Sequence, residues 1–499
     1  MYHIRTTKTG SGATAIQVVR YENRKMIVVA HIGSAHTPSE IKAAKLSAKQ
    51  WIDKISKQRS LFPVDKKSAS TLLSLQKCHY LGFYYNFSYE IISQIFIRFK
   101  FHTLHHNLLT DLALMRIIEP ASKLQSLELL KDCFGVKHLR QHFYQTLPNI
   151  VALKEKVETR VLAVAKKEFN FDFSLIFYDV TTLYFESFAE DEFRKKGFSK
   201  DHKINQPQIL IALIVNTDGF PIAYEIFKGN TFEGHTIIPA IKSFQRKHKV
   251  KQFVVVADAA MLSQNNLKDL EVNNLCYIVG ARLGNMSKSL IKDISNKLGT
   301  IDGATLRLST QHGNLICGFS LKRFRKDKHE MKKQIQKAQA VLQKPSKIKR
   351  LKFVQNIGYN RYQLNTELMT KAKSLLGIKG YYTNLSPEKI DNNTIINRYH
   401  QLWHVEQAFR LAKSDLQIRP IYHFKKDTIK AHLLICFMAL AISKYLEIKT
   451  GKSVKKIVQL FKKVTDARIL NTLTNQEIAL RSDIPAELKS ILSKLDLSY

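Results

Sequence analysis

The sequence has few cysteines and no apolar segment long enough to cross a membrane. The cysteines are odd in number, widely spaced and never arranged as Cys-x-x-Cys, which excludes a disulfide framework and a paired-cysteine zinc site (Cys78, Cys133, Cys276, Cys317 and Cys436). The N-terminal residues lack the apolar core of a signal peptide. The longest apolar run, residues 433–442, is shorter than the ~20 residues of a bilayer-spanning helix and is interpreted as a buried helix. We therefore expect a cytoplasmic protein with no membrane partner.

Acidic residues are also scarce. The chain has 41 Asp and Glu against 79 Lys and Arg, which gives a formal net charge of +38. A surface with this imbalance attracts polyanions. Nucleic acid is the simplest partner, because each phosphate that the protein neutralises releases condensed counterions. A generally basic proteome would explain only part of the surplus.

The length of 499 residues exceeds the ~100–200 residues of one domain, so several domains are expected. Near the N-terminus, apolar stretches at 16–21 and 26–30 predict a β-hairpin around residues 22–25, and Ser39 predicts the start of a helix. Residues 88–165 have apolar residues at helical spacing. These helices could enter a DNA groove or form an ordinary packing unit.

The pattern changes near residue 170. Short apolar runs predict strands at 174–178, 209–215, 222–227, 253–257 and 276–280, with a helix at 236–248. Three strands joined by tight turns, followed by strands that alternate with helices, predict an α/β fold with a mixed sheet flanked by helices.

Residues 285–375 do not continue this pattern and are interpreted as an insertion. They include a strongly basic, helix-like stretch from Arg323 to Gln343, ended by Pro345, which is either a solvated face or a DNA-tracking surface. The resulting division is an N-terminal hairpin arm (1–55), a helical region (56–168), a catalytic core in two parts (169–284 and 376–447) around the insertion (285–375), and a basic helical C-terminal region (448–499).

Two aspartates occupy equivalent places in the predicted sheet. Asp179 and Asp258 each end an apolar strand, where open sheets place their ligand sites. Neighbouring strands would bring the two carboxylates together, and a pair of carboxylates is a typical ligand set for Mg²⁺. Either aspartate alone is more simply explained as the end of a strand. The two together, in a chain poor in acid, favour a metal site.

A third carboxylate is predicted on the helix from Ile395 to Asp415. Tyr399, Glu406 and Lys413 are spaced by seven residues and would share one face of that helix. Glu406 would complete the metal site, Arg410 and Lys413 would bind phosphate, and Trp403 would stack on an unpaired base. The alternative is an exposed face with a Glu406–Arg410 ion pair and with Tyr399 and Trp403 in the core.

Several segments of the chain resemble bacterial insertion-sequence transposases of the DDE class, which have a ribonuclease H-like core. The branch is the insertion-sequence-four superfamily, whose third carboxylate lies in a Y-x2-R-x3-E-x6-K signature. The similarity extends from the N-terminal arm to about residue 445 and is strongest in five segments (Phe177–Glu186, Gly197–Asp201, Pro207–Ile209, Val255–Asp258 and Tyr399–Glu406).

The resemblance implies that Asp179, Asp258 and Glu406 form the catalytic triad. Tyr399 and Lys413 match the first and last positions of the signature, whereas its arginine position holds Leu402. Arg398, Arg410 or a residue of another segment would then supply the missing phosphate contact. Lys200, in the loop between the first two strands of the core, is a further candidate DNA contact.

The implied reaction is phosphoryl transfer with two Mg²⁺ ions, or Mn²⁺ in their place. Water would cut the element's ends, and each freed 3′-hydroxyl would attack target DNA, with no covalent protein intermediate. The partner is double-stranded DNA, as element ends and as target, and a homodimer is expected in the DNA complex, in a bacterial cytoplasm and associated with the nucleoid. The alternatives are a structure-specific nuclease without strand transfer, a catalytically inactive DNA-binding derivative, and an RNA-binding or ribosome-associated protein.

Overall fold

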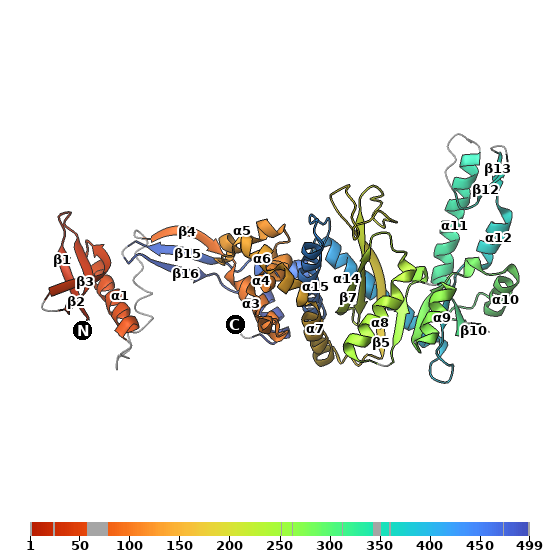
Figure 1. The fold of residues 1–499 in the computed structure, drawn as a ribbon, viewed down its shortest axis with the longest axis horizontal. Helices are drawn as coiled ribbons and strands as arrows, with labels where there is room; N and C mark the ends of the chain where they lie inside the picture. Colours follow the sequence, from red (N-terminus) through yellow and green to blue (C-terminus); the bar gives the residue numbers. More distant parts are fainter. Residues whose placement is uncertain are drawn as a thin grey trace. The chain divides into compact units, whose positions relative to one another are not determined.

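The structure is a computed structural model of the 499-residue chain. It describes residues 2–22, 25–56, 78–250, 252–261, 263–311, 313–342, 351–358, 361–472 and 474–497. The chain divides into two compact units, and each is described by itself (Figure 1). Unit 1 comprises Met1–Gln94, Lys123–Leu139 and Lys455–Tyr499, and unit 2 comprises Ile95–Ser122 and Arg140–Val454.

Unit 1 begins with an antiparallel sheet of β1 (Tyr2–Lys8), β2 (Thr14–Glu22) and β3 (Lys25–Ala35). The pairing of β2 with β3 confirms the predicted hairpin, although its turn at 23–24 lies outside the described residues. The helix predicted to start at Ser39 is α1 (Pro38–Ser56), and Thr37 rather than Ser39 caps its N-terminus. The Glu40 amide donates to the Thr37 hydroxyl (3.3 Å), and the Glu40 carboxylate accepts from the Thr37 amide (3.2 Å), which is a capping box.

The C-terminal region of unit 1 differs from the prediction. It contains α16 (Val454–Phe461) and α17 (Ala486–Lys494), but also a hairpin of β15 (Asp466–Asn471) and β16 (Gln476–Arg481). β4 (Cys78–Tyr84) pairs with β15, so segments far apart in the chain form one sheet. Cross-strand ion pairs Arg468–Glu477 and Arg481–Asp466 support the hairpin. Many positions of these strands are charged or polar, and for this reason an apolar alternation did not reveal them.

Helix α15 (Lys426–Thr450) is a central packing element of unit 2. It contacts α4 (Asn107–Ile118), α6 (Arg140–Ala152) and α7 (Lys154–Phe169). These helices confirm the helical prediction for 88–165. By length and composition α15 could also cross a membrane, but 89% of its apolar window is buried inside the protein. It is therefore a core helix, as the short apolar run at 433–442 predicted.

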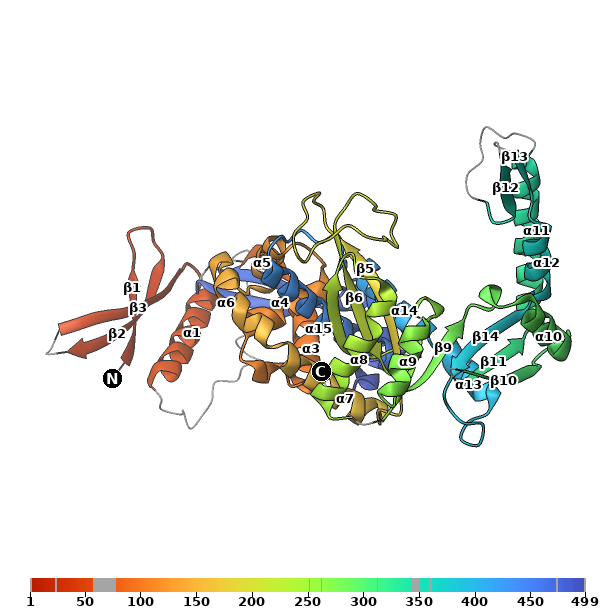
Figure 2. The ribbon, with the colours of Figure 1, turned by 45° about the vertical axis from the view of Figure 1, so that its right-hand side comes forward.

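The core of unit 2 is a mixed sheet. Its central strands follow the order β7-β6-β5-β8-β9, in which β5, β8 and β9 are parallel and β6 is antiparallel to both of its neighbours. This is the strand order of a ribonuclease H-like fold, and helices flank the sheet (Figures 1 and 2), so the predicted fold class is confirmed. The strands are β5 (Leu175–Tyr184), β6 (Gln208–Val215), β7 (Pro221–Lys228), β8 (Val254–Ala257) and β9 (Cys276–Ala281), with α8 (Ile237–His248) and α9 (Gln264–Val272) between them.

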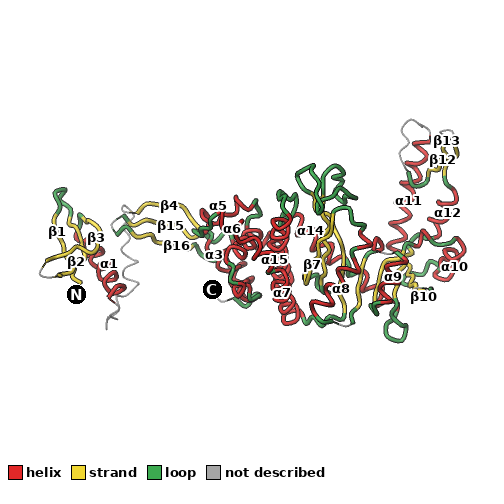
Figure 3. The backbone as a smooth tube through the Cα atoms, in the orientation of Figure 1, coloured by secondary structure: helices red, strands yellow, loops and turns green. Residues whose placement is uncertain are grey.

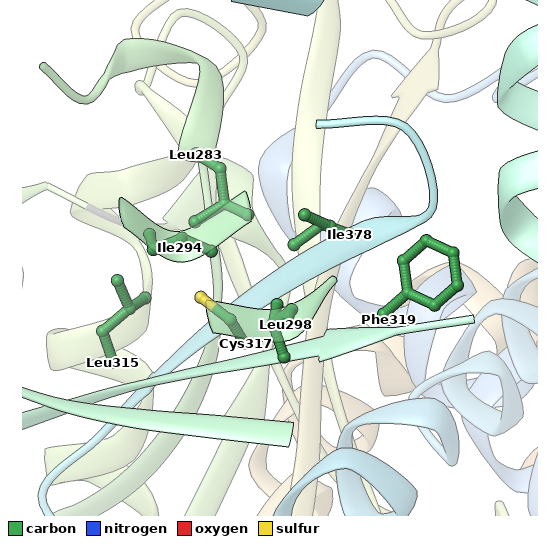
Figure 4. Close-up of a cluster of buried hydrophobic side chains, with 7 residues drawn as sticks. All are labelled: Leu283, Ile294, Leu298, Leu315, Cys317, Phe319 and Ile378. Carbon is green, nitrogen blue, oxygen red and sulfur yellow. The ribbon is translucent and has the colours of Figure 1, made fainter. Parts of the chain in front are cut away.

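The sheet extends beyond β9 into the segment predicted as an insertion. β14 (Ile378–Thr383) pairs with β9, and β11 (Gly313–Phe319) and β10 (Thr305–Thr310) follow it in the same sheet. Buried side chains beneath them form one apolar cluster with α10 (Lys288–Leu298), shown in Figure 4 (Leu283, Ile294, Leu298, Leu315, Cys317, Phe319 and Ile378). Residues 285–319 therefore belong to the sheet and its covering layer.

The part of the insertion that leaves the sheet runs from Ser320 to Gly377. It contains α11 (Leu321–Leu342), the hairpin of β12 (Val354–Gly358) and β13 (Arg361–Leu364), and α12 (Thr366–Ser374), as Figure 3 shows. The predicted basic helix is α11. Pro345, predicted to end it, lies outside the described residues.

The position of α15 in the core leads to a stability prediction. Leu433→Ala removes a fully buried side chain and should lower the free energy of unfolding by about 2–5 kcal/mol. Val272→Ala, at a position that is 80% exposed, is the control and should change it by less than about 0.5 kcal/mol. Chemical denaturation of both variants measures the difference, and similar stabilities would contradict the core role of α15.

Candidate active site

The register of two parallel strands sets Asp179 beside Asp258. Leu175 pairs with Val254, and the pairing continues to Tyr178 and Ala257, so the two aspartates are the next residues on each chain. Asp258 follows the end of β8, as predicted. Asp179 lies in the middle of β5 rather than at its end, because β5 continues to Tyr184 while paired with β6. The two aspartates are therefore adjacent, as predicted, but only Asp258 lies at the end of its strand.

The helix predicted from Ile395 to Asp415 is broken. α13 (Asn392–His400) and α14 (Trp403–Ser414) are separated by a tight turn, in which the Leu402 amide donates to the Tyr399 carbonyl (3.0 Å). Glu406, Arg410 and Lys413 lie on α14. Tyr399 is the penultimate residue of α13 and does not share their helix, so the predicted common face does not include it.

All three predicted carboxylates line one cavity of about 490 Å³ in unit 2. Its wall is formed by β5, the β5–β6 loop, α14 and the segment after α14 (Asp179, Val180, Thr181, Lys200, Asp201, Asp258, Leu402, Glu406, Phe409, Arg410, Lys413, Ser414 and Arg419). Of the eight predicted site residues, Tyr399 and Trp403 are absent from this wall. The cavity therefore combines carboxylates with four basic side chains.

The carboxylates do not form a ready-made metal site. Within the part of the chain that the structure describes, no group of three or more His, Cys, Asp or Glu lies close enough together to hold a metal ion. The donor type nevertheless fits Mg²⁺, which prefers hard carboxylate oxygens. Glu406 is exposed, so its side chain has room to rotate toward the two aspartates.

Burial is the main influence on Asp179. It raises the pKa of this carboxyl from 3.8 to about 6, and the nearby charges of Asp258 and Glu233 act in the same direction. The Lys200 ammonium and a hydrogen bond from the Val180 amide (2.7 Å) oppose the rise. A raised carboxyl pKa next to a second carboxylate is typical of a functional site.

Lys200 is held in place beside Asp179. Its Nζ donates to the Val180 carbonyl (2.6 Å) and forms an ion pair with Glu233 (3.0 Å). The next residue, Asp201, forms ion pairs with Lys413 (3.5 Å) and Arg419 (2.6 Å). Each of these basic groups therefore has an internal anionic partner, and DNA phosphate would have to compete with Asp201 for Lys413 and Arg419.

Other predicted residues lie around the cavity. Leu402, at the arginine position of the signature, is buried in its wall, and Arg410 and Arg419 are the arginines that share the wall. Trp403 is 47% exposed and stacks on His404 (4.1 Å between ring centroids), so it is not a core residue. The alternative that placed Trp403 in the core is therefore wrong, whereas Tyr399 is buried.

Tyr399 lies behind the cavity. It is buried, and its hydroxyl donates to Oδ1 of Asp258 (2.9 Å). Burial, together with the charge of Asp258, raises the pKa of Tyr399 well above its usual range, so the hydroxyl keeps its proton and remains a donor. Lys379, whose Nζ lies 4.4 Å from the centroid of the Tyr399 ring, was missed by the sequence reasoning.

Arg419 and Glu233 were also missed. Neither belongs to a periodic pattern or a segment of the resemblance, and only the fold brings them to the site. Asp201 lies in a segment that carries the resemblance, Gly197–Asp201, and its acidic charge in a basic chain was a usable signal.

Residues 170–442 match the family model described as a transposase DDE domain. The chain belongs to this family. The matched region of the transposase contains all three carboxylates and ends within α15. DDE transposases are DNA-recombining enzymes that generally use divalent metal ions such as Mg²⁺.

Two solved structures are similar to parts of the transposase. A piggyBac transposase synaptic complex with hairpin DNA is 10% identical over 70% of this chain and 68% of that chain, with a TM-score of 0.38. A Mos1 transposase paired-end complex with the left transposon end is 12% identical over 48% of this chain and 75% of that chain, with a TM-score of 0.16. No curated protein matches the chain.

The raised pKa of Asp179 predicts a pH-dependent stability. Because the folded protein binds this proton more tightly than the unfolded chain, stability falls as the pH rises from about 4 to about 6, and the loss persists at higher pH. Asp179→Asn should therefore raise the free energy of unfolding by roughly 1–3 kcal/mol at pH 8, and by much less near pH 4. The measurement is chemical denaturation in a chelating buffer at both values.

Asp172→Asn is the matched control. Hydrogen bonds from Ser174 lower the pKa of Asp172, so this substitution should destabilise the protein at pH 8. If the two variants changed stability in the same direction at pH 8, this would contradict the conclusion that the buried, charged Asp179 carboxylate destabilises the folded protein.

Proposed function

We propose that this transposase cuts the ends of its own insertion element and joins them to target DNA, with Asp179, Asp258 and Glu406 as its catalytic carboxylates. The observation that carries the proposal is their convergence from β5, the end of β8 and α14 on one cavity. The same cavity holds Lys200, Arg410, Lys413 and Arg419, which are suited to phosphate.

The three carboxylates would hold Mg²⁺, or Mn²⁺, as two ions. When bound, these ions make the attacking oxygen more nucleophilic and stabilise the leaving oxygen. Asp179 needs to lose its proton to act as a ligand, and its pKa of about 6 allows this at neutral pH. Asp258 at the end of β8 and Glu406, exposed on α14, would complete the ligand set.

The basic side chains of the cavity bind and orient the DNA backbone. In the first reaction the oxygen of water attacks phosphorus, and the 3′ oxygen of the cut strand leaves as a hydroxyl. In the second, that 3′-hydroxyl attacks a phosphodiester of the target, and the target's own 3′ oxygen leaves. Neither reaction requires a Ser, Cys or Tyr nucleophile, and the Tyr399 hydroxyl is already bound to Asp258. A covalent tyrosine–DNA adduct would contradict this scheme.

The DNA partner is supported by the charge of the chain. The net charge is +38, and α11 places exposed Lys322, Lys326, Lys333 and Lys337 along one stripe, while Phe324, Met331 and Ala338 face inward. We propose that this stripe follows the DNA backbone. The signature residues Tyr399, Glu406 and Lys413 support membership of the bacterial insertion-sequence-four superfamily, and a homodimer in the cytoplasm would hold the two element ends.

The carboxylates are tested by charge removal. Asp179→Asn, Asp258→Asn and Glu406→Gln should each bind DNA normally but cleave it more than about 100-fold more slowly, because loss of a direct ligand exceeds the 10–100-fold cost typical of an outer-shell partner. The substrate is a labelled duplex made from the DNA that flanks the gene, with Mg²⁺ and an unlabelled target.

The control is Asp293→Asn, which removes an exposed acid from α10 and should cleave at the normal rate. Normal cleavage by any of the three site variants would remove that residue from the proposed triad. Cleavage without joined products would assign the protein as a nuclease without strand transfer.

The basic residues of the cavity wall are tested by two substitutions that should change DNA affinity in opposite directions. Lys413→Ala should weaken DNA binding and reduce the slope of log affinity against log salt by about 0.9, the value of one phosphate contact. Asp201→Asn should strengthen binding, because it frees Lys413 and Arg419 from their internal partner. The measurement is a fluorescence anisotropy titration at several salt concentrations. An unchanged slope for Lys413→Ala would contradict the phosphate role.

A further inference from the structure

Tyr399 connects the end of α13 to Asp258, which lies 141 residues earlier in the chain. Its side chain is only 5% exposed, and its ring packs on that of Tyr381 with centroids 4.8 Å apart. Nζ of Lys379 lies 4.4 Å from the ring centroid. Neighbours on β14 therefore hold the ring, and the hydroxyl oxygen has a defined position next to Oδ1 of Asp258.

Gly280 of β9 provides the space for this contact. A Cβ atom at Gly280 would lie 2.5 Å from the Tyr399 hydroxyl oxygen, closer than real Cβ atoms approach. It would also lie 3.1 Å from Cζ of Tyr399 and from Cβ of Ala259, which is tighter than most real contacts. The backbone of Gly280 is not in the left-handed region, so glycine is needed here for space. β9 is the strand next to β8, and the missing side chain lets the tyrosine reach across it to Asp258.

In the part of the chain that the structure describes, the Tyr399 hydroxyl is the hydrogen-bond donor to the Asp258 carboxylate, and the charge of Lys379 attracts the same group. Asp258 follows the last residue of β8, and its side chain is exposed. An exposed carboxylate at a strand end can adopt several rotamers, most of which would not point toward a common cation with Asp179. A buried hydroxyl that donates to one carboxylate oxygen restricts this freedom.

We propose that Tyr399 is a positioning residue, whose hydroxyl holds Oδ1 of Asp258 and so presents Oδ2 to a divalent cation. This rests on the proposed function of Asp258 as a metal ligand. It assigns Tyr399 a role in the protein without DNA, which differs from the phosphate contact expected from the sequence. Its burial and its absence from the cavity wall agree with this role.

The test measures metal binding by the full chain without DNA. Mn²⁺ is titrated and the free ion is followed by electron paramagnetic resonance. Tyr399→Phe keeps the ring and removes only the hydroxyl, and it should weaken Mn²⁺ binding about 10–100-fold, the range for loss of an outer-shell partner. Gly280→Ala should weaken binding by a similar factor, because the new methyl group displaces the hydroxyl.

Gly284→Ala is the matched control for Gly280→Ala. A Cβ at Gly284 would meet no atom within 4 Å, so this variant should bind Mn²⁺ like the wild type. Thermal unfolding in a chelating buffer, together with DNA binding, shows whether each variant is folded. If Tyr399→Phe does not fold, Gly280→Ala carries the test, because it leaves every polar group in place.

A double variant separates a role through Asp258 from any other role of Tyr399. In the background of Asp258→Asn, Tyr399→Phe should cause no further loss of Mn²⁺ affinity. If Asp258→Asn weakens binding but Tyr399→Phe leaves it within twofold of the wild type, the positioning role is wrong and the role of Asp258 stands. If Asp258→Asn itself leaves the affinity unchanged, the proposed function fails at that residue.

Discussion

The parallel pairing of β5 with β8 is the constraint on which the site depends. It aligns residues almost eighty positions apart in the chain: Leu175–Tyr178 pair with Val254–Ala257. Asp179 and Asp258 are the next residue on each strand, so the pairing places the two carboxylates beside each other. Both strands are apolar and almost wholly buried, so the pairing lies in the core of unit 2. The remaining parts of the site are arranged around this pair: α14 brings Glu406, and β9 and α13 bring the hydroxyl of Tyr399.

Much of this arrangement could be predicted from the sequence. The apolar runs located the strands of the core, and the two aspartates that follow such runs were recognised as a pair. The break between α13 and α14 could not be predicted, because a turn with hydrogen bonds of helical type leaves the periodicity of the side chains almost unchanged. The hydrogen bond from Tyr399 to Asp258 depends on space above Gly280, and no local pattern shows which glycine in a chain faces a tyrosine from a distant helix. The hairpin of β15 and β16 was hidden because charged side chains form its cross-strand contacts.

The acids of the protein are few, but two of them form ion pairs with basic residues of the cavity wall. Asp201 binds two cations of the cavity wall and Glu233 binds a third. A surplus of positive charge repels itself, and these carboxylates reduce that repulsion inside a site that we propose binds phosphate. The Asp201 carboxylate also lowers the affinity of the site for anions, because an anion must displace it to gain full contact with Lys413 and Arg419.

The part of the insertion that leaves the sheet, Ser320 to Gly377, carries α11 and α12. It begins after Phe319 and ends before Ile378, and these two residues are paired in neighbouring antiparallel strands. The Ser320 amide donates to the Gly377 carbonyl (2.9 Å) at its base. Because the two ends of this segment are adjacent, it behaves as a closed loop, and the entropic cost of closing such a loop changes only slowly with its length. Its length and sequence can therefore vary between proteins of this architecture without altering where the chain re-enters the sheet. For the same reason, the number of residues between Asp258 and Glu406 does not determine how far apart the two carboxylates lie in space.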